Sequence, residues 1–154
     1  MTPAEAGYWA AVPTLVGILG SLVIPRLATP ARRLPILAVL FVLAFLSCLL
    51  IGTVWQPGLM TGLVLQGIAR SSLMTIAILI LVETPGIGTR RAGAASGLFF
   101  AAAEVGGAGG PFALGLLYDA TGGFQAGLTL LAALSAAMLL CVALLYRLAR
   151  RQAA

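Results

Sequence analysis

Two ionisable residues, Arg70 and Glu104, lie deep inside long apolar stretches of the sequence. A charge in the middle of a membrane costs at least about 2.5–3.5 kcal/mol, so such residues pair with one another or line a water-filled cavity. Gln66 lies one helical turn before Arg70 and would share its helix face. Two interpretations stay open. Either Arg70 and Glu104 form an ion pair that joins two helices, or they line a pathway with Gln66, in which the arginine would favour an anionic substrate and the glutamate would carry protons.

Residues for enzyme chemistry are missing from the sequence. It contains no histidine, which excludes a Ser-His-Asp arrangement. Its four acidic residues are scattered and give no convincing carboxylate pair or metal cage. Cys48 and Cys141 each stand alone in an apolar run, without the spacing of a zinc or redox site. We therefore predict no catalytic residues, no metal site, no cofactor and no enzymatic activity.

A glycine- and proline-rich segment, GGAGGP at residues 106–111, is the second unusual feature. It follows no predicted strand and lacks the spacing of a nucleotide-binding loop. Gly106, Gly110 and Gly115 are four and five residues apart, which would let a neighbouring helix approach closely. Together with Pro111, the same glycines would also allow a flexible or kinked helix at a moving interface. The two roles are compatible, and we predict helix packing and gating for these residues.

The elements that position these residues follow from the composition. Hydrophobic residues make up 61% of the 154 residues and charged residues 8%, whereas a soluble domain has about 45–50% and about 25%. So few charges cannot coat a globule in water, and a lipid bilayer is the solvent that fits. The basic residues lie between apolar runs instead of forming one patch, which argues against nucleic acid as a partner.

Five stretches are long enough to cross the hydrocarbon core, which takes about 20 apolar residues in a helix. None of them alternates with a period of two, which argues against a transmembrane barrel. We predict an all-α transmembrane five-helix bundle that forms a single domain over residues 1–154. The predicted helices cover residues 3–24, 34–54, 59–82, 92–118 and 124–146.

The arginines outside these helices predict the orientation of the bundle. All of them lie in alternate connections or in the C-terminal tail, and the opposite connections contain none. They are Arg26, Arg32, Arg33, Arg90, Arg91, Arg147, Arg150 and Arg151. The positive-inside rule places this side in the cytoplasm. Because the Ala, Gly, Arg and Pro bias suits a bacterial genome, we predict a multi-pass protein of a bacterial inner membrane, with its N-terminus outside and its C-terminus inside.

Three segments in the second half of the chain resemble the major facilitator superfamily of transporters. Residues 90–97 (RRAGAASG), 104–111 (EVGGAGGP) and 117–124 (LYDATGGF) resemble the family's penultimate helix and the turn that follows it. Residues 106–115 are also similar to the glycine–proline motif of the equivalent helix in the first half of the family's fold.

The first half of the chain contains a weaker similarity. Residues 17–33, which include Arg26, Arg32 and Arg33, resemble an altered copy of the family's cytoplasmic loop motif Gly-x-x-x-Asp-Arg-x-Gly-Arg-Arg. The aspartate of that motif is absent here, and Pro25 precedes Arg26. We therefore do not expect the charge relay of that loop in this chain.

By this resemblance, the five helices correspond to the last five of the family's twelve, an incomplete C-terminal half of its fold. The two halves of the family's fold rock against each other around a central cavity. The resemblance implies transport of a small solute, with an organic anion as the candidate, and places Arg70 and Glu104 on helices that face the cavity. Since one incomplete half cannot enclose that cavity, we expect the chain to be inactive alone. The missing helices would come from a longer chain, a partner chain or further copies of this one.

A second hypothesis comes from a different class of protein. The chain would then be a non-transporting interaction or regulatory subunit of the membrane that packs its glycine-rich face against partner helices. An adjacent reading frame that encodes seven helices would favour the transporter, and its absence would favour a stand-alone membrane protein.

Overall fold

The computed structural model describes residues 3–53, 55–84 and 86–152, and these residues form five long helices and one short 3-10 helix. The elements are α1 (Pro3–Leu27), η1 (Pro30–Arg32), α2 (Arg33–Ile51), α3 (Gln56–Glu83), α4 (Gly88–Thr121) and α5 (Gln125–Gln152). Five helices are long and apolar enough to cross a membrane. The all-α transmembrane bundle predicted from the sequence is thus confirmed, and the described residues contain no strand.

The helix ends differ from the predicted spans where polar residues continue or stop a helix. The largest difference is in α5, which continues past residue 146 to Gln152 because its arginine-rich end keeps the helical backbone after the apolar stretch has finished. In contrast, α2 ends earlier than predicted, at Ile51. There the Thr53 hydroxyl donates a hydrogen bond to the Leu50 carbonyl at 2.7 Å and so satisfies a backbone acceptor that a longer helix would have used.

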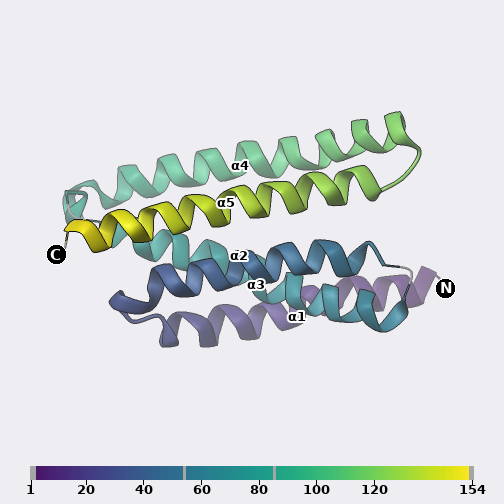
Figure 1. Cartoon of the computed structure of the whole chain (residues 1–154), viewed down its shortest axis with the longest axis horizontal. Coiled ribbons are helices and arrows are strands. Elements are labelled where there is room, and N and C mark those ends of the chain that lie inside the picture. Colours follow the sequence, from purple (N-terminus) through teal and green to yellow (C-terminus); the bar gives the residue numbers. More distant parts are fainter. Residues whose placement is uncertain (1–2, 54, 85, 153–154) are drawn as a thin grey trace.

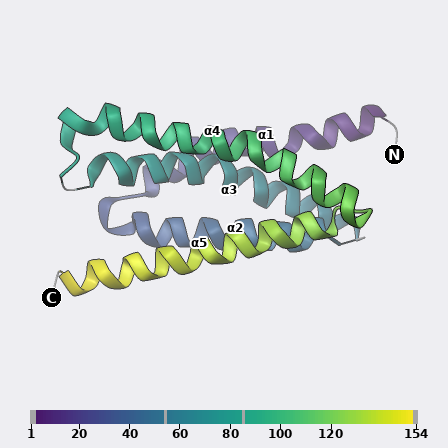
Figure 2. The ribbon, with the colours of Figure 1, turned by 90° about the horizontal axis from the view of Figure 1, so that it is seen from above.

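The helices run roughly side by side along the long axis of the molecule, and the two ends of the chain lie at opposite ends of the bundle (Figure 1). α3 lies at the centre, where it packs extensively against both α1 and α2, and α5 packs against α2. Seen from above, α1 and α4 lie on one side of α3, whereas α2 and α5 lie on the other (Figure 2). The small buried core lies where α2, α3 and α5 meet the turn after α1. It consists of Ala28, Leu37, Leu40, Ile76 and Val142.

Glycines let α1 and α3 approach each other closely. A Cβ atom placed on Gly67 would lie 2.7 Å from the Cα of Pro13, and one placed on Gly20 would lie 3.4 Å from the Cα of Ile68. A Cβ on Gly17 would overlap the hydroxyl of Ser71. The absence of side chains at these positions therefore sets the distance between the two helices.

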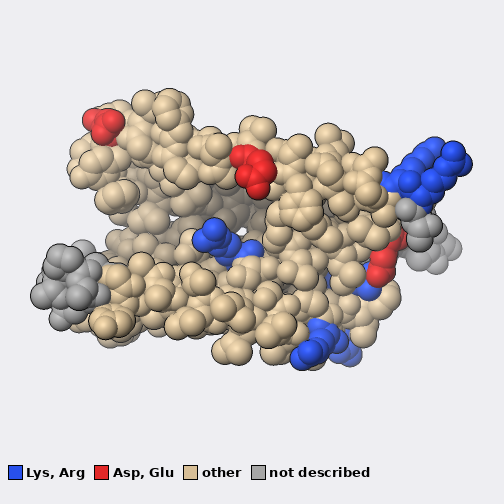
Figure 3. All heavy atoms as spheres, turned by 180° about the vertical axis from the view of Figure 1, so that it is seen from behind, with Lys and Arg blue, Asp and Glu red and all other residues tan. Residues whose placement is uncertain are grey.

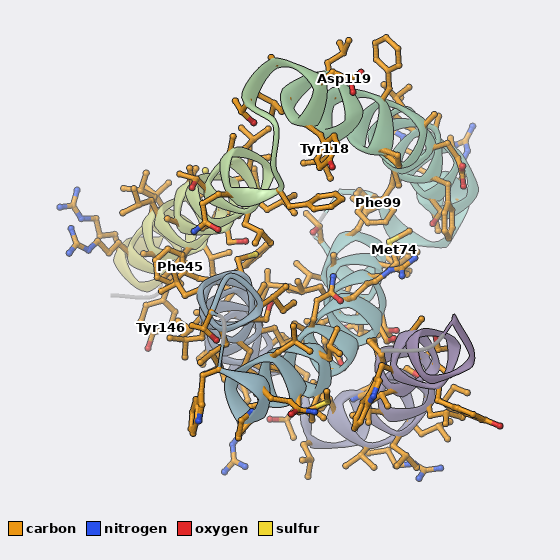
Figure 4. The ribbon with its side chains drawn as sticks, turned by 90° about the vertical axis from the view of Figure 1, so that its right-hand side faces the viewer. Phe45, Met74, Phe99, Tyr118, Asp119 and Tyr146 are labelled. Atoms are coloured by element: carbon orange, nitrogen blue, oxygen red, sulfur yellow. The ribbon has the colours of Figure 1, made fainter. Side chains whose placement is uncertain are left out.

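In contrast, the rest of the chain barely covers α4. This helix has only sparse contacts with α3 and α5, and none of the most apolar stretch between Arg90 and Thr121 is buried. Seen along the bundle, α4 stands apart from α1, and Tyr118 points from α4 toward the space between α4 and α5 (Figure 4). The helix ends where Gly122 adopts the left-handed conformation (φ 72°) and its N–H donates to the Tyr118 carbonyl at 2.8 Å.

Candidate functional site

Arg70 lies near the middle of α3, a helix of 28 residues, and borders two cavities. One cavity, of about 410 Å³, lies between α1 and α3. The other, of about 400 Å³, is formed by α2, α3 and α5. The side chain of Arg70 is exposed. Seen from behind, the molecule has basic atoms within a hollow halfway along its length (Figure 3). The structure thus places a permanent positive charge on an open surface near the middle of a helix long enough to cross a membrane.

The cavity between α1 and α3 is the more polar of the two. Thr14 and Ser21 line it from α1, and Ser71 lines it from α3 next to Arg70. Met74 borders both cavities, and it projects from α3 on the side between α1 and α4 (Figure 4). A guanidinium beside several hydroxyl groups can bind an oxygen-rich anion.

Gln66 reaches the second cavity together with Arg70, as the one-turn spacing predicted. The hydroxyls of Ser47 and Ser135 also line this cavity, but each donates to a carbonyl of its own helix, at 2.7 and 2.9 Å respectively. Its other lining residues are mainly apolar, with Leu131 and Met138 of α5 among them. The structure therefore brings Gln66 and Arg70 together in a largely apolar setting.

Glu104 lies on the exposed surface of α4 and lines neither of the two cavities beside Arg70. No ion pair joins it to Arg70 within residues 3–53, 55–84 and 86–152. The first interpretation, an ion pair between Arg70 and Glu104 that joins two helices, is therefore not found among the described residues. A proton-carrying or pairing role for Glu104 stays a prediction that would involve groups beyond those residues or a movement of α4.

Arg33 forms the ion pair that the sequence did not predict. Its Nη1 donates to Oε2 of Glu83, and its Nε donates to the carbonyl of Ala28 at 3.2 Å. The Arg33 side chain is 13% exposed and that of Glu83 46%. One side chain thus connects the start of α2, the turn after α1 and the end of α3. The available signal was Glu83 itself, an acid at the end of a predicted helix on the arginine-rich side.

Four other arginines that the sequence placed in the connections lie within helical segments, because the helices extend beyond the predicted apolar spans. Arg26 lies in the last turn of α1, Arg32 ends η1, and Arg90 and Arg91 lie in the first turn of α4. All four are exposed. Figure 3 shows basic atoms gathered at one end of the molecule, which agrees with a single arginine-rich side.

The glycine-rich segment of α4 has open space beside it. Cβ atoms placed on Gly106, Gly110 or Gly115 would meet no atom of the described chain within 4 Å. Pro111 lies inside the helix and is exposed as well. The predicted packing and gating roles of these residues therefore involve no neighbour within the described part of the chain.

The fold defines a multi-pass membrane protein, and this site gives it a polar surface near the middle of α3. The described residues contain no group of three or more Cys, Asp or Glu side chains that could hold a metal ion. A family model of the Major Facilitator Superfamily matches residues 1–154. The chain therefore belongs to this superfamily, a family of transporters and not of enzymes, which confirms the resemblance drawn from its motifs. Searches of curated proteins and of solved structures gave no match.

Proposed function

We propose that this chain forms part of a secondary transporter for a small organic anion and that Arg70 binds the anion. The observation that carries the proposal is the position of Arg70 in the middle of a membrane-length helix, exposed beside two cavities. A fixed positive charge at that depth attracts anions and disfavours cations. Gln66, one turn away at the second cavity, would donate a further hydrogen bond along the same path.

Glu104 would couple transport to protons. The exposed carboxyl group of this residue makes no ion pair within the described part of the chain. A carboxyl group can accept and release a proton, which is the chemistry that a proton-driven transporter requires.

Further helices would complete the pathway. The uncovered α4 has open space beside Gly106 and Gly110, and it exposes Glu104. Polar groups of this kind are poor neighbours for lipid tails, and small residues favour contact with another helix. We therefore propose that a longer chain, a partner chain or further copies of this chain supply the other wall, and that the residues described here do not transport alone.

We propose that these helices lie in a bacterial inner membrane, with the start of α1 outside the cell and the end of α5 in the cytoplasm. The arginine-rich end of the bundle and the positive-inside rule support this orientation. A fluorescent reporter fused after Arg151 should fold in the cytoplasm, and alkaline phosphatase fused there should be inactive. Active phosphatase at that position would reverse the proposed orientation.

Transport assays test the role of Arg70. In a transporter completed by the missing helices, Arg70→Ala should raise KM for organic anions at least tenfold, because a hydrogen-bonded charge contributes about 1.5–3 kcal/mol. Arg91→Ala removes the same charge from an exposed position away from both cavities and serves as the matched control. Unchanged kinetics in Arg70→Ala would reduce this residue to a structural role and refute the proposal.

A further inference from the structure

We infer that the cavity between α1 and α3 selects a carboxylate that carries a hydroxyl or keto oxygen on the neighbouring carbon. Arg70 binds the carboxylate, and the hydroxyls of Thr14 and Ser71 bind the second oxygen. This inference rests on the proposed function, because it assigns the substrate class to the same arginine. The inference goes further than the proposed function because it specifies one cavity and the polar groups that bind the ligand there.

Two of the three hydroxyl groups in the cavity of Arg70 differ from most others in the helices. Helical serine and threonine hydroxyls commonly donate to a carbonyl of the preceding turn, which leaves them no free donor. Such bonds are made by Ser21, Ser47, Thr61, Thr75, Thr84, Thr121, Thr129 and Ser135. In contrast, Thr14 and Ser71 make no side-chain hydrogen bond within the described residues, and both line the cavity of Arg70.

The close contact of α1 and α3 holds these groups on the two walls of one cavity. Gly67 lies one turn before Ser71 and packs against the backbone of Pro13, the residue before Thr14. Gly17 lies three residues after Thr14 and packs against the side chain of Ser71. Because backbone meets backbone at Gly67 and Pro13, neither wall can shift without disturbing the helix pair. The cavity of about 410 Å³ is within the size range of small-molecule sites.

The charge of the cavity limits the charge of its ligand. Arg70 is the one charged residue among the described residues that line it. A monoanion is therefore neutralised, whereas the second carboxylate of a dianion would be desolvated without a partner. Each free hydroxyl can both donate and accept, so the pair suits a hydroxyl group or a keto oxygen next to the carboxylate. An unsubstituted carboxylate would leave both hydroxyls without a partner.

Two ligands of nearly the same size separate these possibilities. The full chain in lipid nanodiscs is titrated with lactate and with propanoate, which differ in one hydroxyl group, and with succinate as a dianion. We expect lactate to bind about three- to tenfold more tightly than propanoate, the range that corresponds to one net hydrogen bond. Arg70→Ala should weaken the binding of both monoanions at least tenfold.

Variants of the hydroxyl groups test the assignment to this cavity. Thr14→Val and Ser71→Ala should each lower the affinity for lactate toward that for propanoate and leave the affinity for propanoate unchanged. Thr75→Val is the matched control, because its hydroxyl already donates to the Ser71 carbonyl at 3.1 Å and does not line the cavity. Circular dichroism of each variant verifies the fold, and the two hydroxyl variants test the assignment independently of each other.

The outcomes distinguish this inference from the proposed function. If succinate or propanoate binds as tightly as lactate, and this binding depends on Arg70, the inference is wrong and the proposed function stands. A preference for lactate that survives both hydroxyl variants would also overturn the inference. If no anion binds in a manner that depends on Arg70, both the inference and the proposed function fail.

Discussion

Replacing Gly67 with alanine should separate α1 from α3. The added Cβ would lie 2.7 Å from the Cα and 2.8 Å from the carbonyl carbon of Pro13, and Cβ atoms essentially never come so close to other atoms. Both neighbours are backbone atoms of α1, so no side chain can rotate away to make room. The two helices must move apart, and the cavity between them must change shape.

The expected cost of Gly67→Ala is a difference of two effects. Overpacking a tight interface typically costs about 1–3 kcal/mol. Alanine recovers about 0.5–1 kcal/mol relative to glycine inside a helix. Because the clash at Gly67 is with backbone, the upper part of the first range applies, and we expect a net loss of about 2 kcal/mol in the free energy of unfolding.

Gly106→Ala is the matched control for this prediction. It makes the same chemical change inside a helix, but its added Cβ would meet nothing within 4 Å. Only the helix-propensity effect then acts, so its stability should be unchanged or slightly raised. Unfolding of detergent-purified protein is followed by circular dichroism for both variants. Equal stabilities for Gly67→Ala and Gly106→Ala would refute the argument that α1 and α3 pack through backbone contact.

Two further substitutions test local features of the structure. Glu83→Gln should lower the free energy of unfolding by at most about 1 kcal/mol, and by less at high salt, because the Glu83 side chain is 46% exposed. Arg33→Ala should lower it further, because this change also removes the hydrogen bond to the Ala28 carbonyl. Equal losses for the two variants in a denaturation series would contradict this order. Gly122→Ala should cost about 1 kcal/mol, because alanine is strained at a φ of 72°, whereas Gly123→Ala should be nearly neutral in the same assay.

The helices could be predicted because composition and length constrain them strongly. A chain with 61% hydrophobic residues and breaks between membrane-length apolar runs has few alternatives to a transmembrane bundle. The ends of the helices do not follow from the apolar length, because that length measures the membrane core and the helical backbone continues beyond it. This explains why α5 extends to Gln152.

The candidate site was predictable only where its residues are local in sequence. Gln66 and Arg70 share a cavity because one helical turn separates them. The ion pair of Arg33 and Glu83 joins residues 50 positions apart, and that pairing depends on how α2 and α3 pack. For the same reason, the sequence did not distinguish the free hydroxyls of Thr14 and Ser71 from those of other serines and threonines.

The glycines show that their spacing in the sequence does not determine whether another helix packs against them. Gly58, Gly62 and Gly67 in α3 have the same four- and five-residue spacing as the glycines singled out in α4. Cβ atoms on all three would crowd neighbouring atoms, whereas those on the α4 set would meet open space. The two patterns differ in the position of their helices, since α3 lies between α1 and α2 and α4 lies at the edge of the bundle. A small-residue pattern therefore indicates that a helix can be approached closely, and only the packing of the whole bundle determines which neighbour approaches it.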